Sequence, residues 1–584
     1  MNLSSVYHIS ADSYCYPLDE NRLMIKLRTD YDVDRAELVW GDPFECGMFG
    51  GDISWNGTHS DMLHTVNLER HKVWQLVVEP KYKRCRYFFV LHSGKETVYM
   101  LEDGFKSQDE FKNYQGRRQD FFFPWINSSD IVRPASWVNK TIWYQIFPDR
   151  FCNSGTDRGI KYHKWSSPDK KASNAYLYGG DLKGACGKLD YLKDLGITGL
   201  YFTPVNESPS NHKYDTADYN RIDKSFGSDK DMKELVAQAH LRGMRVMLDG
   251  VFNHCGEQFK PWQDVLEKGR DSRYFNWFMI NKYPFSKTGC RTRKGEYYSF
   301  AFVDCMPKLN TNNPEAAQYF IDVCSRWITE YDIDAIRLDV SDELAHSFIK
   351  KLRIALIKLK PDFYICGEAW HNSTAWLRGD EFDAIMNYPL QEVIGSYWKN
   401  RNMTAKEFEY RTNYCYDQYH IQTNNAMLNL LDSHDTMRLM TGCGNNEDIF
   451  YQKLIVLFTM SGSTCIYYGT EIGLEGGYDP DCRRPMPWRE IENGRYDERL
   501  SFMKRIIKMR KEYKSLRSGQ LRFIKSGCDR VLMYEKYDEE SVVRVIVNCS
   551  GKPVAADIRK GNLILQRCYT NGYLGVNGAA VIKY

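Results

Sequence analysis

Residues 334–343 read D-A-I-R-L-D-V-S-D-E, and the rest of the chain is best understood from this stretch. A buried β-strand is indicated by the alternating apolar residues Ile336, Leu338 and Val340. Alternation then places Arg337 and Asp339 together on the other face of that strand. A guanidinium next to a carboxylate lowers the pKa of that carboxylate and keeps it ionised, as a carboxylate nucleophile requires. A structural ion pair at a strand end would look the same in sequence, so other stretches must decide.

The composition indicates a globular protein of several domains. A chain of 584 residues is too long for one hydrophobic core, and two to four domains are expected. The net charge of +3 gives no reason to expect a nucleic-acid partner. An aromatic content of 14% suits the binding of sugar rings, but it suits the packing of cores equally well.

The cysteines and the apolar segments bear on the cellular compartment. The 17 cysteines are scattered without a CxxC pair, which argues against zinc and thioredoxin-like sites and fits a reducing compartment. The first residues lack the basic segment and apolar core of a signal peptide. No apolar stretch is long enough to cross a bilayer. We therefore expect a cytoplasmic protein that has no membrane partner.

Three regions follow from the secondary-structure patterns. Residues 1–130 alternate as short strands and predict an N-terminal β-sandwich. Residues 131–517 contain eight strands that alternate with helices, the count of a (β/α)8 TIM barrel. Within them, residues 255–312 are too long for a plain loop and predict a small subdomain inserted after strand 3. Residues 518–584 return to strands and predict a C-terminal β domain, so the expected fold class is α/β with β domains at both ends.

Polar clusters occur where four of the barrel strands end. The third strand ends in L-D-G-V-F-N-H, the fourth in R-L-D, the fifth in C-G-E-A-W and the seventh in L-D-S-H-D. The polar residues of these segments are Asp249, Asn253, His254, Arg337, Asp339, Glu368, His434 and Asp435. Barrel enzymes carry their functional residues at these strand ends. Any one cluster alone could be a solvated loop, but four together indicate an active site.

The four segments, in this order, resemble the four signature regions of the α-amylase family of glycoside hydrolases. M-P-K-L-N at residues 306–310, S-N-H-K-Y-D-T-A-D-Y at 210–219 and Y-Q-I-F-P-D-R-F at 144–151 resemble its neopullulanase, cyclomaltodextrinase and maltogenic-amylase group. The β-rich N-terminal region fits that group as well, and the resemblance covers nearly the whole chain. Ala335 and Met437 depart from residues that are frequent in relatives, but neither touches the expected chemistry.

The resemblance implies roles for the polar residues. Asp339 would be the nucleophile, Glu368 the acid/base and Asp435 a third carboxylate that binds sugar hydroxyls. Retaining hydrolysis needs its two carboxyl groups about 5 to 5.5 Å apart, and the apolar neighbours of Glu368 would favour its proton-donating form. The expected substrate-binding residues are Tyr214, which would stack on a sugar ring, and His254, Arg337, His434, His212, Asp249, Trp370, Asp479 and Arg484. For Asp249 and Asn253 a purely structural role remains an alternative.

The resemblance also raises the question of calcium. Relatives often bind calcium through an N-G-D-type loop after the first barrel strand. Here that loop runs from Asn153 to Asp157 with one acidic residue, and Gly179 and Asp181 match the second half of the motif. The sequence leaves calcium binding at these four residues open. The chemistry expected at Asp339 and Glu368 requires no cofactor, so any calcium would be structural.

The expected activity is retaining hydrolysis of α-1,4-glucosidic bonds in cyclodextrins, pullulan, maltooligosaccharides and starch, with an α-glucan oligosaccharide or cyclodextrin as substrate. A glucanotransferase on the same scaffold would use a sugar in place of water, and sequence barely separates the two. A catalytically inactive sugar-binding protein is a third alternative, which the three intact carboxylates disfavour. Relatives with this arrangement commonly dimerise, so a homodimer is expected.

Overall fold

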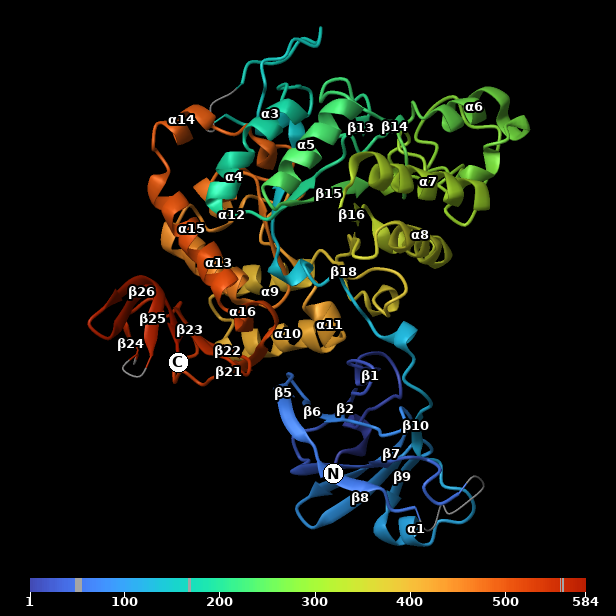
Figure 1. Cartoon of the computed structure of the whole chain (residues 1–584), viewed down its shortest axis with the longest axis vertical. Helices are drawn as coiled ribbons and strands as arrows, with labels where there is room; N and C mark the ends of the chain where they lie inside the picture. The colour runs from blue at the N-terminus through green and yellow to red at the C-terminus, as the bar shows by residue number, and fades with distance from the viewer. Residues whose placement is uncertain (48–54, 166–169, 557, 559–560) are drawn as a thin grey trace. The chain divides into compact units, whose positions relative to one another are not determined.

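A computed structural model describes residues 1–47, 55–165, 170–556, 558 and 561–584. The described chain divides into two compact units, which Figure 1 colours along the sequence. The first unit comprises Met1–Arg133, Leu377–Gly379 and Asn400–Asn424. The second comprises Pro134–Trp376, Asp380–Lys399 and Asn425–Tyr584.

Two antiparallel sheets form the core of the first unit. One has the order β1 (Cys15–Pro17), β2 (Leu23–Thr29), β6 (Lys72–Val78), β5 (Leu63–Asn67), and the other the order β4 (Thr58–Asp61), β3 (Arg35–Gly41), β7 (Cys85–Ser93), β8 (Glu96–Leu101), β9 (Gly104–Ser107). Alternate residues of β2 and β7, among them Ile25 and Phe89, belong to one buried cluster. The predicted N-terminal β-sandwich is confirmed.

The other face of β2 is buried as well, which the alternation of its sequence does not predict. Lys26 is only 6% exposed, and its Nζ lies 2.9 Å from Asp417 at the end of α10 (Ala405–Asp417). Tyr16 of β1 stacks on His420, just before α11 (Ile421–Asn424), with ring centroids 4.2 Å apart. Segment 400–424 therefore covers a sheet face that the sequence alone suggests is open to solvent.

Eight parallel strands of the described chain form one sheet in the second unit. In spatial order they are β18 (Ala384–Ile385), β17 (Tyr364–Gly367), β16 (Ala335–Leu338), β15 (Arg245–Gly250), β12 (Gly199–Phe202), β11 (Ile142–Ile146), β20 (Ser463–Tyr467) and β19 (Leu428–Asn429). A parallel bridge between Met386 and Leu428 joins the two ends of this order, so the sheet closes into a barrel. The predicted (β/α)8 barrel is confirmed.

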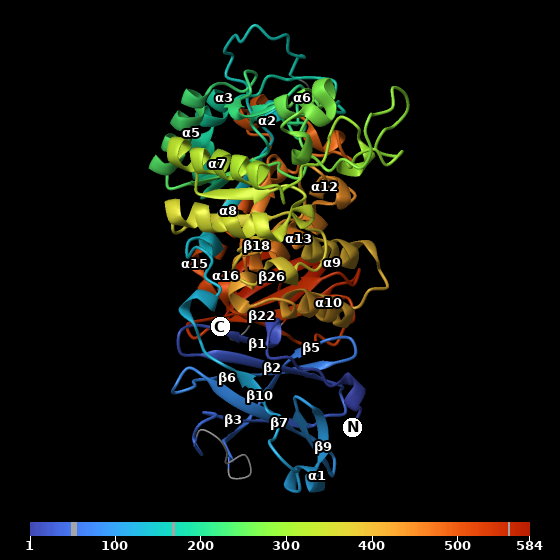
Figure 2. The ribbon, with the colours of Figure 1, turned by 90° about the vertical axis from the view of Figure 1, so that its right-hand side faces the viewer.

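The outer helices begin at the caps that the sequence provides. Ser228 caps α5 (Asp229–Leu241) through a capping box with Asp231, and Asn313 caps α7 (Pro314–Tyr331), which has proline at its first position. Figures 1 and 2 show α5, α7 and α8 (His346–Leu359) lying side by side on the outside of the barrel.

Two further parts complete the second unit. Residues 255–312 follow β15 and contain α6 (Lys260–Lys268) with only isolated bridges, such as Phe278 to Leu309. After the barrel, an antiparallel sheet is built from β21 (Gln520–Phe523), β22 (Val531–Tyr537), β23 (Val542–Asn548), β26 (Tyr573–Lys583), β24 (Val554–Ala555) and β25 (Asn562–Thr570). The expected C-terminal β domain is confirmed. Among the described residues, every helix is too short or too polar to cross a membrane.

Candidate active site

A cavity of about 550 Å³ gathers most of the predicted site residues. Its lining includes Asp339, Glu368, Asp435, His212, Tyr214, His254, Trp370 and Asp479. These residues come from loops that follow different barrel strands, so closure of the sheet brings together side chains up to 267 positions apart in sequence. Arg337, Asp249 and His434 lie directly behind this lining, where they contact its residues.

Arg337 is the electrostatic centre of the site. Its side chain is fully buried, and its Nη1 lies 2.7 Å from Oδ1 of Asp339 and 2.8 Å from Oδ1 of Asp249. Its Nη2 lies 2.7 Å from Oε2 of Glu368. One guanidinium therefore holds three carboxylates, and the two expected catalytic ones bind to adjacent nitrogens of the same group.

The pKa of Asp339 differs from the sequence expectation. Burial raises it well above its usual range, Arg337 opposes this, and the carboxylates of Glu368 and Asp249 raise it further. The pKa values of Asp249 and Asp435 are also raised, in both cases mainly by burial. Two buried cations, Arg337 and Arg483, oppose these shifts, and they face the four carboxylates of Asp339, Glu368, Asp249 and Asp435. This excess of carboxylates favours the retention of a proton, as a site with one nucleophile and one acid requires.

Both oxygens of the Glu368 carboxylate are bound. Oε2 accepts a hydrogen bond of 2.9 Å from the backbone N–H of Val340, and Oε1 accepts one of 3.1 Å from the indole N–H of Trp370. The Trp370 ring stacks on Tyr388, with centroids 3.6 Å apart and planes 6° from parallel. Trp370 is nevertheless 51% exposed, so one side of it faces the cavity and solvent.

A chain of hydrogen bonds runs from Tyr214 through His434, the neighbour of Asp435, to Gln145 inside the barrel. The hydroxyl of Tyr214 contacts Oδ2 of Asp249 at 3.0 Å and Nε2 of His434 at 2.5 Å. Gln145 of β11 contacts the other ring nitrogen of His434 at 2.9 Å. Burial lowers the pKa of His434 well below its usual range, so the imidazole is neutral. Asp249 thus supports Tyr214 and Arg337 from behind the cavity, which fits the structural alternative for this residue.

His254 has an unused hydrogen-bonding atom at the cavity. It is 1% exposed, and its Nε2 has no hydrogen-bond partner among the described residues. Burial lowers the pKa of His254 to about 3, so its ring is neutral near pH 7. A buried neutral nitrogen without a partner, at the wall of this cavity, suits a sugar hydroxyl.

At one position the structure differs from the expected site. Arg484 does not line the cavity, because its guanidinium is bound by Asp481 at 2.8 Å. Its neighbour Arg483 lines the cavity instead, with Nη1 2.9 Å from Asp479 and Nη2 3.5 Å from Asp435. The sequence R-R offers both arginines, and only the direction of the backbone decides between them. Sequence reasoning also missed Asn174 and Phe300, which come from loops without a motif.

The loop expected to bind calcium is held by the chain itself. The carboxylate of Asp181 is 2% exposed; its Oδ1 accepts from the N–H of Gly184, and its Oδ2 accepts from Ser154 Oγ at 2.6 Å and from Arg158 Nη2 at 2.9 Å. Calcium takes six to eight oxygen ligands. In this loop a guanidinium already neutralises the buried carboxylate, so the residues present do not fit that ion.

The side chains of Asn153 and Asp157, two other expected calcium ligands, accept hydrogen bonds from the backbone of their own turns. Oδ1 of Asn153 accepts the N–H of Gly155 at 2.6 Å, and Oδ1 of Asp157 accepts the N–H of Gly159 at 2.9 Å. Gly179 has φ +83°, and a Cβ atom there would lie 2.8 Å from Asn153 Nδ2. Within the described residues, no cluster of three or more His, Cys, Asp or Glu side chains could hold a metal ion.

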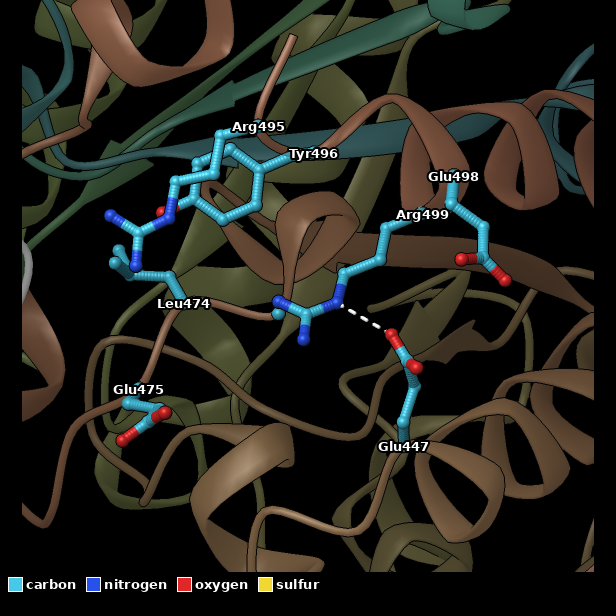
Figure 3. Close-up of a pocket in the computed structure, with 8 residues that line it drawn as sticks. Glu447, Leu474, Glu475, Arg495, Tyr496, Glu498 and Arg499 are labelled. Carbon is cyan, nitrogen blue, oxygen red and sulfur yellow. Dashed lines mark hydrogen bonds and ion pairs between the residues drawn. The ribbon is translucent and has the colours of Figure 1, made fainter.

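A second, polar pocket of about 270 Å³ lies away from the carboxylate cluster (Figure 3). Its lining includes Glu447, Arg499 and Glu498, and Figure 3 shows the pair of Arg499 Nε and Glu447 Oε1, which are 2.8 Å apart. Glu498 is bound by Arg567 at 3.1 Å. These charges neutralise one another, and none of the predicted site residues lines this pocket.

Comparison with known proteins agrees with this arrangement. The α-amylase catalytic-domain family model matches residues 145–519, and the α-amylase N-terminal Ig-like domain model matches residues 1–127. The chain is 43% identical to a cyclomaltodextrinase of Geobacillus thermopakistaniensis, over 96% of this chain and 92% of that protein. It is 40% identical to a maltogenic α-amylase of Bacillus acidopullulyticus, over 94% and 92% of the two chains.

Structural comparison gives the same result. A solved cyclomaltodextrinase structure matches with a TM-score of 0.90 and 33% identity over 100% of both chains. By sequence, the chain is also 38% identical to neopullulanase 2 of Thermoactinomyces vulgaris, over 89% of this chain and 86% of that protein. The chain belongs to the α-amylase family and is a glycoside hydrolase of the type formed by cyclomaltodextrinases, maltogenic amylases and neopullulanases.

Proposed function

We propose that this chain hydrolyses α-1,4-glucosidic bonds with retention of configuration, with Asp339 as nucleophile and Glu368 as acid/base. The observation that carries the proposal is the binding of both carboxylates by adjacent nitrogens of Arg337, each at 2.7 Å. Two carboxylates held by one guanidinium lie close to each other, as the nucleophile and the acid/base of a retaining hydrolase must.

The residues supply each step of the reaction. A carboxylate oxygen of Asp339 attacks the anomeric carbon, while Glu368 gives its proton to the glycosidic oxygen of the departing sugar. The products of this step are a covalent glycosyl-enzyme and a free sugar hydroxyl. Water then attacks the same carbon, Glu368 takes a proton from it, and the bond to Asp339 breaks. Asp435 and His254 would hold sugar hydroxyls, and Arg483 would hold Asp435 in place.

The stereochemistry of the first product tests this proposal. Two inversions at one carbon give the α-anomer, so proton NMR of freshly released maltose should show the α signal before mutarotation. A β-anomer as the first product would exclude a covalent intermediate at Asp339. The same reaction mixture separates hydrolysis from transfer, because a glucanotransferase would yield longer oligosaccharides along with maltose.

We further infer that small and cyclic α-glucans are the preferred substrates. The support is the group to which the chain belongs, whose members are named for cyclomaltodextrin, maltose and pullulan. Parallel assays on β-cyclodextrin, pullulan and soluble starch test this inference. Higher kcat/KM on starch than on β-cyclodextrin would contradict it.

A cytoplasmic homodimer remains our proposal for the working form. A relative from Bacillus subtilis, 42% identical over 88% of this chain, is named an intracellular maltogenic amylase, which supports the location. For the dimer, the support is the N-terminal β-sandwich that the group shares. If the N-terminal unit of one copy narrows the active-site cleft of another, dilution should shift the sedimentation coefficient and lower the preference for β-cyclodextrin over starch in parallel. A constant preference across a dimer-to-monomer transition would contradict the idea.

A further inference from the structure

The backbone next to the expected nucleophile is strained. Val340, directly after Asp339, has φ +43° and ψ +49°, the left-handed conformation. A β-branched residue adopts this conformation rarely, because its Cβ substituents crowd the neighbouring carbonyl oxygen. Such strain persists only where the surrounding structure enforces it, and it concentrates at functional sites.

Three hydrogen bonds to one residue enforce this conformation. The N–H of Val340 donates to the side-chain Oε2 of Glu368 at 2.9 Å. The N–H of Ser341 donates to the backbone carbonyl of Glu368 at 3.1 Å, and the Ser341 hydroxyl donates to the same carbonyl at 2.6 Å. The two residues that follow Asp339 therefore hold both the backbone and the carboxylate of Glu368.

Close packing makes this contact specific. Ser341 is fully buried, and it faces Gly367 at the end of β17. A Cβ atom on Gly367 would lie 2.7 Å from Ser341 Oγ and 2.7 Å from the ring of Phe382. The two chain segments can approach only because residue 367 has no side chain, and Ser341 fills the remaining space with a hydrogen-bonding group.

We propose that Val340 and Ser341 are positioning residues that fix the acid Glu368 relative to the nucleophile Asp339. This inference rests on the proposed function, because it assigns a task only if those two carboxylates perform the reaction. Proton donation and nucleophilic attack must reach two atoms of the same glycosidic bond at once, and small misplacements of a catalytic group are costly. Since Val340 is bonded covalently to Asp339 and by hydrogen bond to Glu368, the segment couples the positions of both.

The Ser341 hydroxyl gives experimental access to this coupling. Ser341→Ala removes the 2.6 Å bond but leaves the carbonyl of Glu368 with the N–H of Ser341 as a partner. No buried polar group is left without a partner, so the fold should tolerate the change. Its effect should fall on proton donation by Glu368, and not on attack by Asp339.

Two substrates with different leaving groups separate these tasks. Cleavage of maltotriose needs a proton on the departing sugar oxygen, whereas α-maltosyl fluoride releases fluoride ion with little need for an acid. We expect Ser341→Ala to lower kcat/KM on maltotriose about tenfold or more, with KM within about twofold, and to leave kcat/KM on α-maltosyl fluoride within about twofold. The ratio of kcat/KM on maltotriose to kcat/KM on α-maltosyl fluoride therefore reports the effect of the acid. Both values report formation of the glycosyl-enzyme, the step in which the acid acts.

Ser463 on β20 provides a matched control. Its N–H and hydroxyl both donate to the carbonyl of Met427, at 2.8 and 3.1 Å, and it is fully buried like Ser341. Ser463→Ala therefore removes the same kind of bond from the same barrel without touching Glu368. It should change thermal stability to a similar extent and leave the ratio between the two substrates at the wild-type value.

The possible outcomes distinguish the inference from the function on which it rests. A wild-type chain that turns over neither substrate would contradict the proposed function itself. If the wild type cleaves both, an equal loss on both substrates in Ser341→Ala, or no loss on either, overturns the positioning role alone. Ser341→Cys keeps a weaker donor on a slightly larger side chain, and it should give an intermediate ratio; it also replaces Ser341→Ala if that variant fails to fold.

Discussion

The guanidinium of Arg158 lies 2.9 Å from a carboxylate oxygen of Asp181, in the loop for which the sequence left calcium binding open. This ion pair predicts that the enzyme is independent of calcium. An excess of EDTA should leave both the thermal unfolding temperature and the activity unchanged. A fall in the unfolding temperature on chelation, reversed by calcium, would show that the ion binds after all.

The same pair predicts a cost for removing the arginine. Arg158→Ala would leave a carboxylate that is 2% exposed without its cation, which costs about 3 kcal/mol in buried pairs. The unfolding temperature should fall by several degrees, since a 1 kcal/mol loss lowers it by a few degrees in domains of ordinary size. As a control, Lys161→Ala removes an exposed cation from the same loop and should have little effect.

Asp339→Asn preserves shape but removes the negative charge of the nucleophile. We expect kcat to fall by the order of 10⁴, because no covalent intermediate can form at an amide. Binding of β-cyclodextrin, measured by titration calorimetry, should persist, since the remaining cavity wall is intact. A variant that keeps a tenth of the wild-type rate would remove Asp339 from this role.

Glu368→Ala tests the acid/base by chemical rescue. The variant should cleave maltotriose very slowly but still react with α-maltosyl fluoride to form the glycosyl-enzyme. Azide fits the space that the side chain vacates and needs no base, so it should accelerate turnover and appear in the product as α-maltosyl azide. Absence of rescue, together with an equal loss on both substrates, would assign Glu368 a purely structural role.

The adjacent arginines 483 and 484 should behave differently on substitution. Arg483→Leu removes the cation next to Asp435 and Asp479 in the cavity, so kcat/KM on maltotriose should fall at least tenfold, about 1.4 kcal/mol in transition-state binding. Arg484→Leu breaks a contact with Asp481 outside the cavity and should change stability but leave kcat/KM near wild type. The reverse result would return Arg484 to the site.

Buried His8 predicts a pH dependence of stability. Burial lowers the pKa of His8 to about 3, and its ring contacts the carbonyl of Lys26 at 2.7 Å and the hydroxyl of Tyr87 at 2.9 Å. The unfolded chain titrates near 6.5, so it binds a proton that the folded chain does not as the pH falls below that value. Stability is therefore fully present above pH 6.5 and falls by about 3 kcal/mol by pH 4.

Comparison of variants isolates this contribution from other histidines. His8→Gln should flatten the decline of unfolding free energy between pH 6.5 and pH 4, relative to wild type. His59→Gln, at a side chain that is 60% exposed, should retain the wild-type slope. Parallel slopes for all three proteins would show that His8 is protonated in the folded state.

The strand pattern and the four motifs were sufficient to predict the barrel and most of its cavity residues. Local sequence could not predict the conformation of Val340, which alternation places in the strand. The strand ends at Leu338, and the N–H of Val340 binds a side chain 28 positions away. Nor could local sequence predict the raised pKa of Asp339, which depends on burial and on three carboxylates that lie on or after other barrel strands. The choice of Arg483 over Arg484 depends on which side a backbone turn presents, and sequence spacing does not contain that information.

Segment 400–424 has a consequence for how such a gene can be rearranged. The chain leaves the second unit after α9 (Tyr388–Lys399), supplies α10 and α11 to the first unit, and then returns to form β19 and β20. The last two barrel strands are therefore made only after the chain has revisited the sandwich. No single cut near residue 133 separates two self-contained modules, so exchange of the N-terminal domain between family members would have to carry two distant pieces of coding sequence together.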